Sequence, residues 1–128
     1  MILLDTHAWI WLASEPAKLG RAVRKRLASS TPRAVAAISC WEIATLVDRK
    51  RIELDRGSAQ WMDDTMQELR LELLPLTPAI AARAFQLGDA FHGDPADRLI
   101  VATALVHGAT LATKDRLIGK SGTVPTLW

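Results

Sequence analysis

The segment from Asp94 to Thr113, DPADRLIVATALVHGATLAT, decides the fold class. Its middle is apolar almost all round, which is typical of a helix buried between other elements. Asp94 can cap this helix, Pro95 can be its first residue, and Gly108 follows its last turn. The short apolar run ATLAT comes next and has the length and composition of a strand. A buried helix that leads directly into a strand is the unit from which α/β proteins are built.

The same alternation extends over the whole chain. Short apolar runs predict strands at residues 1–5, 32–39, 71–76, 109–113 and 124–128. Helical spacing and cap signals predict helices at residues 6–13, 21–30, 40–51, 58–70, 77–88 and 97–108, with a loop and a helical turn at residues 114–119. Strands that alternate with helices favour a parallel sheet covered on both sides. We therefore expect a single α/β domain over residues 1–128.

Composition excludes several classes of protein. The chain has 128 residues, of which 49% are hydrophobic and 23% charged, as in soluble globular domains. No stretch approaches the roughly 20 consecutive apolar residues of a membrane span. The first residues lack a basic segment and contain Asp5, so they make a poor signal peptide. The lone Cys40 excludes an internal disulfide, fits a reducing cytoplasm and, with only three histidines, makes a zinc site improbable.

Basic residues are unevenly distributed although the formal net charge is only +2. The segment from Lys18 to Leu27 contains five of them and no acid, and a second run ends at Arg51. Such runs are either solvated helix faces or a surface that contacts phosphates. The candidate RNA-binding residues are Arg21, Arg24, Lys25, Lys50 and Arg51.

Four acidic residues stand where predicted strands end or helices begin. Asp5 closes the first strand, Glu42 follows the second, and Asp115 follows the strand ATLAT by two residues. Asp97 lies in the first turn of the buried helix. Ligand sites of open parallel sheets form beyond the carboxyl ends of the strands. If the strands are parallel, all four acids therefore face the same edge of the sheet.

Taken singly, each of these acids also has a structural explanation. Ser39 and Glu42 match the S-x-x-E capping box, in which the acid bonds back to the cap residue. Asp97 is a first-turn acid favoured by the helix dipole. Asp5 can cap a strand end, and Asp115 can close a turn.

Taken together, the acids favour a metal site. Two carboxylates about 5 Å apart repel each other by roughly 3 kcal/mol at an effective dielectric constant near 20. Arg98, Lys114 and Arg116 could help to neutralise the charge, but a divalent cation does so directly, and all-oxygen ligands suit Mg²⁺ or Mn²⁺. Such a metal activates water for phosphoryl transfer. Because an N-cap side chain folds onto its own helix, we assign Asp94 to the cap and Asp97 to the site.

Four blocks of the sequence, LLDTHAWIWL, SCWEIATL, DPADRLIVATA and LATKD, resemble the acidic motifs of PIN-domain ribonucleases. Within that superfamily they are similar to the VapC toxins of bacterial toxin–antitoxin pairs. The resemblance implies a three-layer fold with a short parallel sheet flanked by helices. It places the metal-binding acids at Asp5, Glu42, Asp97 and Asp115, supported by Thr6 and Thr113.

The resemblance also implies an activity and partners. The expected activity is that of a Mg²⁺- or Mn²⁺-dependent endoribonuclease that uses activated water and leaves 5′-phosphate and 3′-hydroxyl ends. The expected assembly is a homodimer that pairs with a cognate antitoxin protein, away from any membrane.

Other functions remain as alternatives. A haloacid-dehalogenase-like phosphatase needs a second aspartate two residues after the first, where this chain has His7. A receiver domain needs adjacent acids before its first helix, and a dinucleotide-binding domain needs a glycine-rich first turn. A different class is a catalytically silent PIN-fold module that binds RNA or protein. Such a module is expected to lose one or more of the acids, and all four are present.

The five tryptophans and three histidines lead to further expectations. Trp9, Trp41 and Trp61 fall on apolar helix faces and are predicted to lie in the core. Trp11 is predicted to extend a dimer or antitoxin surface, with stacking on RNA as the alternative. His7 is interpreted as a packed or partly exposed first-turn residue rather than a base. The other two histidines are expected in a loop (His92) and at a helix end (His107).

Overall fold

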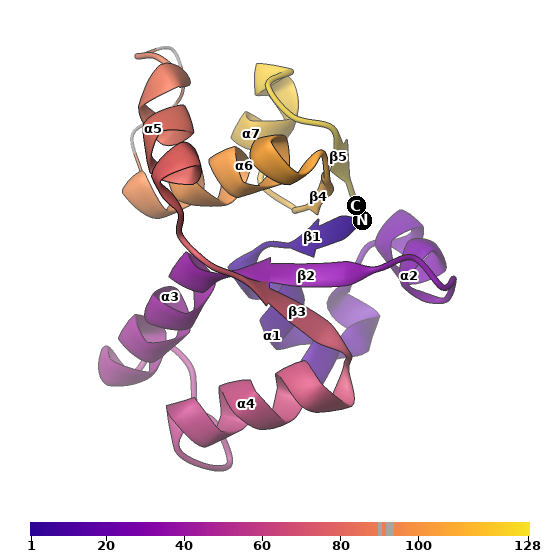
Figure 1. Ribbon diagram of the computed structural model, residues 1–128. Helices are drawn as coiled ribbons and strands as arrows, with labels where there is room; N and C mark the ends of the chain where they lie inside the picture. Colours follow the sequence, from indigo (N-terminus) through magenta and orange to yellow (C-terminus); the bar gives the residue numbers. More distant parts are fainter. Residues whose placement is uncertain (90, 92–93) are drawn as a thin grey trace.

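The computed structural model describes residues 1–89, 91 and 94–128. Within these residues five parallel strands form one sheet in the order β3-β2-β1-β4-β5 (Figure 1). The strands are β1 (Ile2–Leu4), β2 (Arg33–Ala36), β3 (Leu71–Leu74), β4 (Thr110–Ala112) and β5 (Thr126–Leu127). The predicted parallel sheet is confirmed.

The helices connect these strands as expected. They are α1 (Thr6–Ser14), the 3₁₀ turn η1 (Pro16–Lys18), α2 (Arg21–Leu27), α3 (Ala37–Asp48), α4 (Ser58–Glu68), α5 (Pro78–Gln86), α6 (Pro95–His107) and α7 (Arg116–Ser121). Three predicted helix ends are confirmed, at Thr77, Asp94 and Gly108. Thr77 accepts a hydrogen bond from the Ile80 N–H, Asp94 accepts one from the Ala96 N–H, and Gly108 ends α6 with a φ of 62°. His107 is the last residue of α6, whereas His92 lies outside the described residues.

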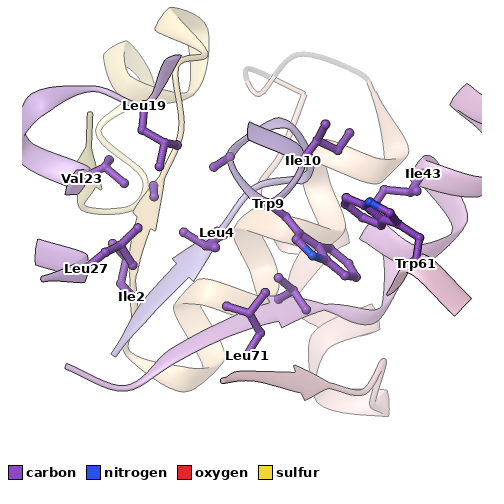
Figure 2. Close-up of a cluster of buried hydrophobic side chains, with 13 residues drawn as sticks. Ile2, Leu4, Trp9, Ile10, Leu19, Val23, Leu27, Ile43, Trp61 and Leu71 are labelled. Carbon is purple, nitrogen blue, oxygen red and sulfur yellow. The ribbon is translucent and has the colours of Figure 1, made fainter. Parts of the chain in front are cut away.

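Both faces of the sheet are covered, which gives three layers. Successive strand residues point to opposite faces, so Leu3 packs in one apolar cluster while Ile2 and Leu4 pack in the other. The cluster shown in Figure 2 joins β1 to α1, α2 and α4, and the second cluster joins the sheet to α6 and α7. In Figure 1, α5, α6 and α7 lie on one side of the sheet, and α1 and α4 lie on the other.

The largest buried side chain in the first cluster is Trp9. Its ring lies 5.8 Å from that of Trp61, and its Nε1–H donates a hydrogen bond of 2.9 Å to the hydroxyl of Thr65 (Figure 2). The hydrogen bond satisfies the single polar group of the indole, so the side chain can be buried completely. The predicted core positions of Trp9 and Trp61 are therefore confirmed.

Two expectations about α3 were wrong. The helix begins at Ala37 rather than Cys40, so Ser39 lies inside the first turn and is not the N-cap. The core-facing side of α3 carries Ser39 and Ile43, which are one turn apart. Trp41 lies two residues from each of them, about 200° round the helix, and its side chain is 63% exposed. The prediction that Trp41 is a core residue was wrong, because the side of α3 that packs against the core is the one that carries Ser39 and Ile43.

No described helix combines the length and the apolarity that crossing a bilayer would demand.

Candidate active site

The carboxyl ends of the central strands bring the candidate acids together. In the register of the sheet, Leu4 pairs with Val35 on one side and with Ala112 on the other. Asp5 follows Leu4 directly, and its N–H donates to the carbonyl of Ala112. Asp5, Glu42, Asp97 and Asp115 line one open cavity of about 640 Å³ at this edge. The structure thus places all four acids where the parallel sheet was expected to place them.

Asp5 caps helix α1 from the floor of the cavity. Its Oδ1 accepts a hydrogen bond of 2.8 Å from the Ala8 N–H. Burial raises the pKa of Asp5, and the negative charge of Asp97 raises it further. Hydrogen bonds from Thr113 and Ala8 and the nearby His7 act in the opposite direction. The raised pKa shows that the protein surroundings do not compensate the charge of this carboxylate fully.

Glu42 is held by two hydroxyl groups rather than by a helix cap. Thr6 donates a hydrogen bond to its Oε1, and the oxygens of Thr6 and the buried Ser39 lie 2.9 Å apart. A threonine hydroxyl has only one proton. With Glu42 ionised that proton goes to the carboxylate, so Ser39 must be the donor to Thr6. The predicted capping box is wrong, because Ser39 contacts α1 and does not cap α3.

Burial is also the largest cause of a raised pKa at Glu42. The charges of Asp97, Asp94 and Asp5 raise the pKa further, and the hydrogen bond from Thr6 lowers it. Glu42 and Asp5 come from different layers of the fold, yet both experience the field of Asp97. The charge of Asp97 therefore raises the pKa of both carboxylates.

Helix α6 presents two aspartates to the cavity. Asp94 is the N-cap, as predicted, and Asp97 lies half-buried in the first turn. Both line the cavity, so capping does not remove Asp94 from it. Asp5 and Asp115 are also N-caps and also line the cavity. Being a cap and facing the cavity are therefore compatible, contrary to the argument that separated Asp94 from Asp97.

Asp115 caps the last helix, α7. Its Oδ1 accepts hydrogen bonds from the N–H groups of Leu117 and Ile118, at 2.8 and 3.2 Å. Its own N–H donates to the hydroxyl of Thr113, a buried residue that also bonds to Asp5. Thr113 thus connects two of the acids, as Thr6 supports a third.

The donor chemistry of the cavity fits a hard divalent cation. All four candidate ligands are carboxylates, which suit Mg²⁺ or Mn²⁺. Glu42 and Asp115 each keep a second oxygen that accepts no hydrogen bond from the described residues. In their present rotamers, however, no three acidic, histidine or cysteine side chains of the described residues are grouped to hold an ion. The four acids nevertheless line the same cavity, which is the arrangement that a shared cation requires.

The basic residues near the site differ in the groups that they contact. Lys114 and Arg116 are exposed and line the cavity, but neither forms an ion pair with Asp5, Glu42 or Asp115 within the described residues. The hydrogen bonds of Arg98 to described residues go to backbone carbonyls and not to Asp5, Glu42 or Asp115. Its guanidinium donates to the carbonyls of Ala84, Gly88 and Phe91, and so fastens the end of α5 to α6.

The basic residues predicted to bind RNA lie outside the cavity. Arg21, Arg24 and Lys25 are exposed on α2, whereas Lys50 and Arg51 are exposed just beyond α3. Figure 1 shows α2 and the end of α3 on opposite sides of the molecule. The two runs therefore form separate patches, and their role in binding RNA stays a prediction.

Comparison with known proteins identifies the family. The family profile described as PIN domain matches residues 2–120. The chain belongs to the PIN domain family. This PIN domain is 42% identical over 115 residues to Ribonuclease VapC22 of Mycobacterium tuberculosis (strain ATCC 25618 / H37Rv), which covers 90% of this chain and 87% of that protein. The resemblance inferred from the four sequence blocks is confirmed.

Solved structures agree with the PIN fold. VapBC2 from Rickettsia felis, bound to a DNA fragment from its promoter, superposes with a TM-score of 0.76 at 17% identity, covering 100% of this chain and 99% of that one. VapBC-1 from nontypeable Haemophilus influenzae gives a TM-score of 0.71 at 16% identity, with coverages of 99% and 97%. At these identities the likeness shows the fold of this PIN domain and not its partners.

Proposed function

We propose that this PIN domain is a metal-dependent endoribonuclease that acts as the toxin of a toxin–antitoxin pair. The observation that carries the proposal is the convergence of Asp5, Glu42, Asp97 and Asp115 on one cavity. The relative named a ribonuclease, at 42% identity, supports the activity. The VapBC neighbours support the class of partner. A cytoplasmic location, expected from the lone Cys40, stays a prediction.

In this proposal the four carboxylates hold Mg²⁺ or Mn²⁺. When bound, such an ion lowers the pKa of a water molecule and neutralises charge that develops on the phosphate. Thr6, fixed by Ser39, orients Glu42, and Thr113 orients Asp5 and Asp115. Lys114 and Arg116 lie on the rim, where they can contact the RNA backbone. We expect water to attack the phosphorus directly, so that its oxygen forms the new P–O bond while the bond to the 3′-oxygen breaks; the 3′-oxygen leaves and takes up a proton, which gives 5′-phosphate and 3′-hydroxyl ends.

The proposed homodimer is supported by an exposed apolar surface beside the cavity. Phe85 of α5 is 87% exposed and Trp41 of α3 is 63% exposed. The hollows next to these two side chains share Pro95 and Leu99, so the surface is continuous across the start of α6. A large exposed apolar surface is typical of protein interfaces. We expect Phe85→Asp to convert a dimer to a monomer in light scattering, while Arg24→Asp leaves the mass unchanged.

The activity is tested with purified, antitoxin-free protein and total RNA. Cleavage is measured with Mg²⁺, with Mn²⁺ and with chelator, for the wild type, Asp97→Asn and Asp94→Asn. Asn caps helices about as well as Asp, so Asp94→Asn keeps the start of α6. We expect chelator and Asp97→Asn each to abolish cleavage, and Asp94→Asn to retain most of it.

Melting temperature gives a second readout that does not depend on finding the right RNA. A ligand that binds only the folded state raises stability in proportion to the logarithm of its concentration. We expect Mg²⁺ and Mn²⁺ to raise the melting temperature of the wild type and of Asp94→Asn, but much less that of Asp97→Asn. A folded wild type that neither cleaves RNA nor responds to metal would contradict the metal-dependent nuclease and favour the alternative, a PIN-fold binding module.

A further inference from the structure

Trp11 occupies a different environment from the other tryptophans of α1 and α4. Trp9, two residues earlier on the same helix, is fully buried in the core. Trp11 is half-buried, and it lines the acid cavity together with His7 and Lys114. It packs against the first apolar cluster from outside. One side of this indole therefore rests on the core while the rest faces the candidate active site.

The surroundings of the Trp11 ring are cationic and aromatic. The Nζ atoms of Lys18 and Lys114 lie 5.9 and 5.6 Å from its centroid. The imidazole of His7 lies at 5.6 Å with a tilt of 54°, and the ring of Trp128 meets it edge-on at 5.8 Å. Lys18 also pairs with Glu15 at 3.3 Å and does not line the acid cavity, whereas Lys114 does line it. Aromatic rings interleaved with lysines are the combination that binds single-stranded nucleic acid.

The charge of the cavity explains why such a subsite is needed there. The four carboxylates that line the cavity repel a polyanion until a cation is bound. The basic residues of α2 and of the end of α3 do not line this cavity. The cationic side chains that do line it, Lys114 and Arg116, flank Asp115, and Lys114 is the one beside Trp11.

We propose that Trp11 and Lys114 form a nucleotide subsite at the rim of the cavity, in which a base of the RNA stacks on the indole and Lys114 contacts the adjoining phosphate. The proposal rests on the proposed ribonuclease function and deepens it. It assigns recognition of one nucleotide beside the cut to stacking, which accepts any base because every base has an aromatic face. The sequence favoured a dimer or antitoxin surface for Trp11, whereas the place of its ring at the acid cavity, with Lys114 beside it, favours RNA instead.

The test uses a short single-stranded RNA of mixed sequence in which one nucleotide is 2-aminopurine, in Ca²⁺ in place of Mg²⁺. The 2-aminopurine position is moved along the RNA, and its fluorescence and the anisotropy of the bound RNA are recorded. We expect one position to be strongly quenched by the wild type. Trp11→Leu should remove that quenching and weaken binding by about tenfold, the typical effect of losing one stacked base.

Three further variants separate stacking from folding. Trp11→Phe keeps an aromatic face and should restore most of the quenching. Lys114→Gln, an exposed substitution, should weaken binding while keeping the quenching, and should lower the salt dependence of binding by about one phosphate contact. Asp63→Asn, an exposed substitution on α4 outside the acid cavity, should change neither signal.

The outcomes distinguish the two proposals. Binding and quenching by a wild type that does not cleave RNA in Mg²⁺ would support the subsite and contradict the nuclease. Cleavage by the wild type, with equal RNA binding and quenching in folded Trp11→Leu, would overturn the subsite and leave the nuclease intact. Loss of dimer or antitoxin binding in Trp11→Leu, with RNA binding unchanged, would assign Trp11 to a protein interface and overturn the subsite as well.

Discussion

The apolar layer around Trp9 and the acid cavity share strand β1 and helix α1, but they differ in how their polar groups are paired. In the apolar layer the one polar atom of Trp9 is paired with Thr65, and no buried side-chain nitrogen or oxygen of the described residues lacks a partner. In the cavity, carboxylates raise one another's pKa. Apolar packing and paired hydrogen bonds therefore stabilise the fold around Trp9, whereas the like charges at the carboxyl ends of the strands destabilise it. A cation bound among those carboxylates would relieve their repulsion.

The largest effect on stability is expected on the core side of this comparison. Trp9→Ala removes a fully buried indole and leaves the hydroxyl of Thr65 without its donor. We expect the free energy of unfolding to fall by about 3–5 kcal/mol, as for other large-to-small core substitutions. Urea denaturation measures it. Gln67→Ala, on the exposed face of α4, serves as the control and should cost less than about 0.5 kcal/mol. Equal costs for the two variants would contradict the assignment of Trp9 to the core.

The largest effect on activity is expected at Asp5. Asp5→Asn keeps the cap on α1, since Asn is as good an N-cap as Asp, but removes one carboxylate from the cavity. We expect RNA cleavage to fall at least about a hundredfold, which corresponds to about 2.7 kcal/mol of activation free energy. Stability should stay the same or increase, because the repulsion between Asp5 and Asp97 disappears.

Cleavage rates and thermal melts of Asp5→Asn together check this expectation. Asp63→Asn, an exposed substitution on α4, is the matched control and should alter neither quantity. A large loss of stability in Asp5→Asn with cleavage retained would make Asp5 a structural cap alone.

A smaller effect is expected at Arg98, which joins the end of α5 to α6 on one side of the sheet. Arg98→Met keeps much of the side-chain volume but removes the donors to Ala84, Gly88 and Phe91. We expect unfolding to become easier by about 2 kcal/mol, because hydrogen bonds from charged groups contribute about 1.5–3 kcal/mol. Arg24→Met on exposed α2 should lie within about 0.5 kcal/mol of the wild type. If Arg98→Met and Arg24→Met both have the melting temperature of the wild type, Arg98 does not stabilise the contact between α5 and α6.

The smallest effect is expected at the cap of α6. Asp94→Ala removes the hydrogen bond to the Ala96 N–H and should cost about 1 kcal/mol, whereas Asp94→Asn should cost almost nothing. Denaturation curves of both variants, with cleavage assays alongside, separate the cap from the cavity. If Asp94→Asn instead lost cleavage without losing stability, Asp94 would belong with the acids of the site.

Local signals in the sequence predicted much of the fold, and their failures have a common cause. Thr77, Asp94 and Gly108 marked helix ends correctly because caps depend on neighbouring backbone groups. The start of α3 was missed by three residues because Ser39 resembles a cap, while its hydroxyl actually meets Thr6 from a different element. Trp41 was misplaced for the same reason, since the side of α3 that faces the core depends on the elements packed against it.

The same distinction holds for the candidate site. The positions of the four acids followed from strand ends and helix starts, which the sequence displays. The links between them did not, because Thr6 to Glu42 and Thr113 to Asp5 are contacts between segments far apart in the chain. The different surroundings of Trp9 and Trp11 also required the packing of α1 against its neighbours.

By itself the sequence determined an α/β chain with parallel strands, because apolar periodicity and caps are local, and it set out the acidic blocks of a PIN domain. Only the tertiary structure decided how the acids share one cavity, that Arg98 fastens α5 to α6, and that Trp11 lies beside Lys114 at the rim. Those outcomes depend on contacts between distant segments, and such contacts exist only once the sheet has brought its carboxyl ends together.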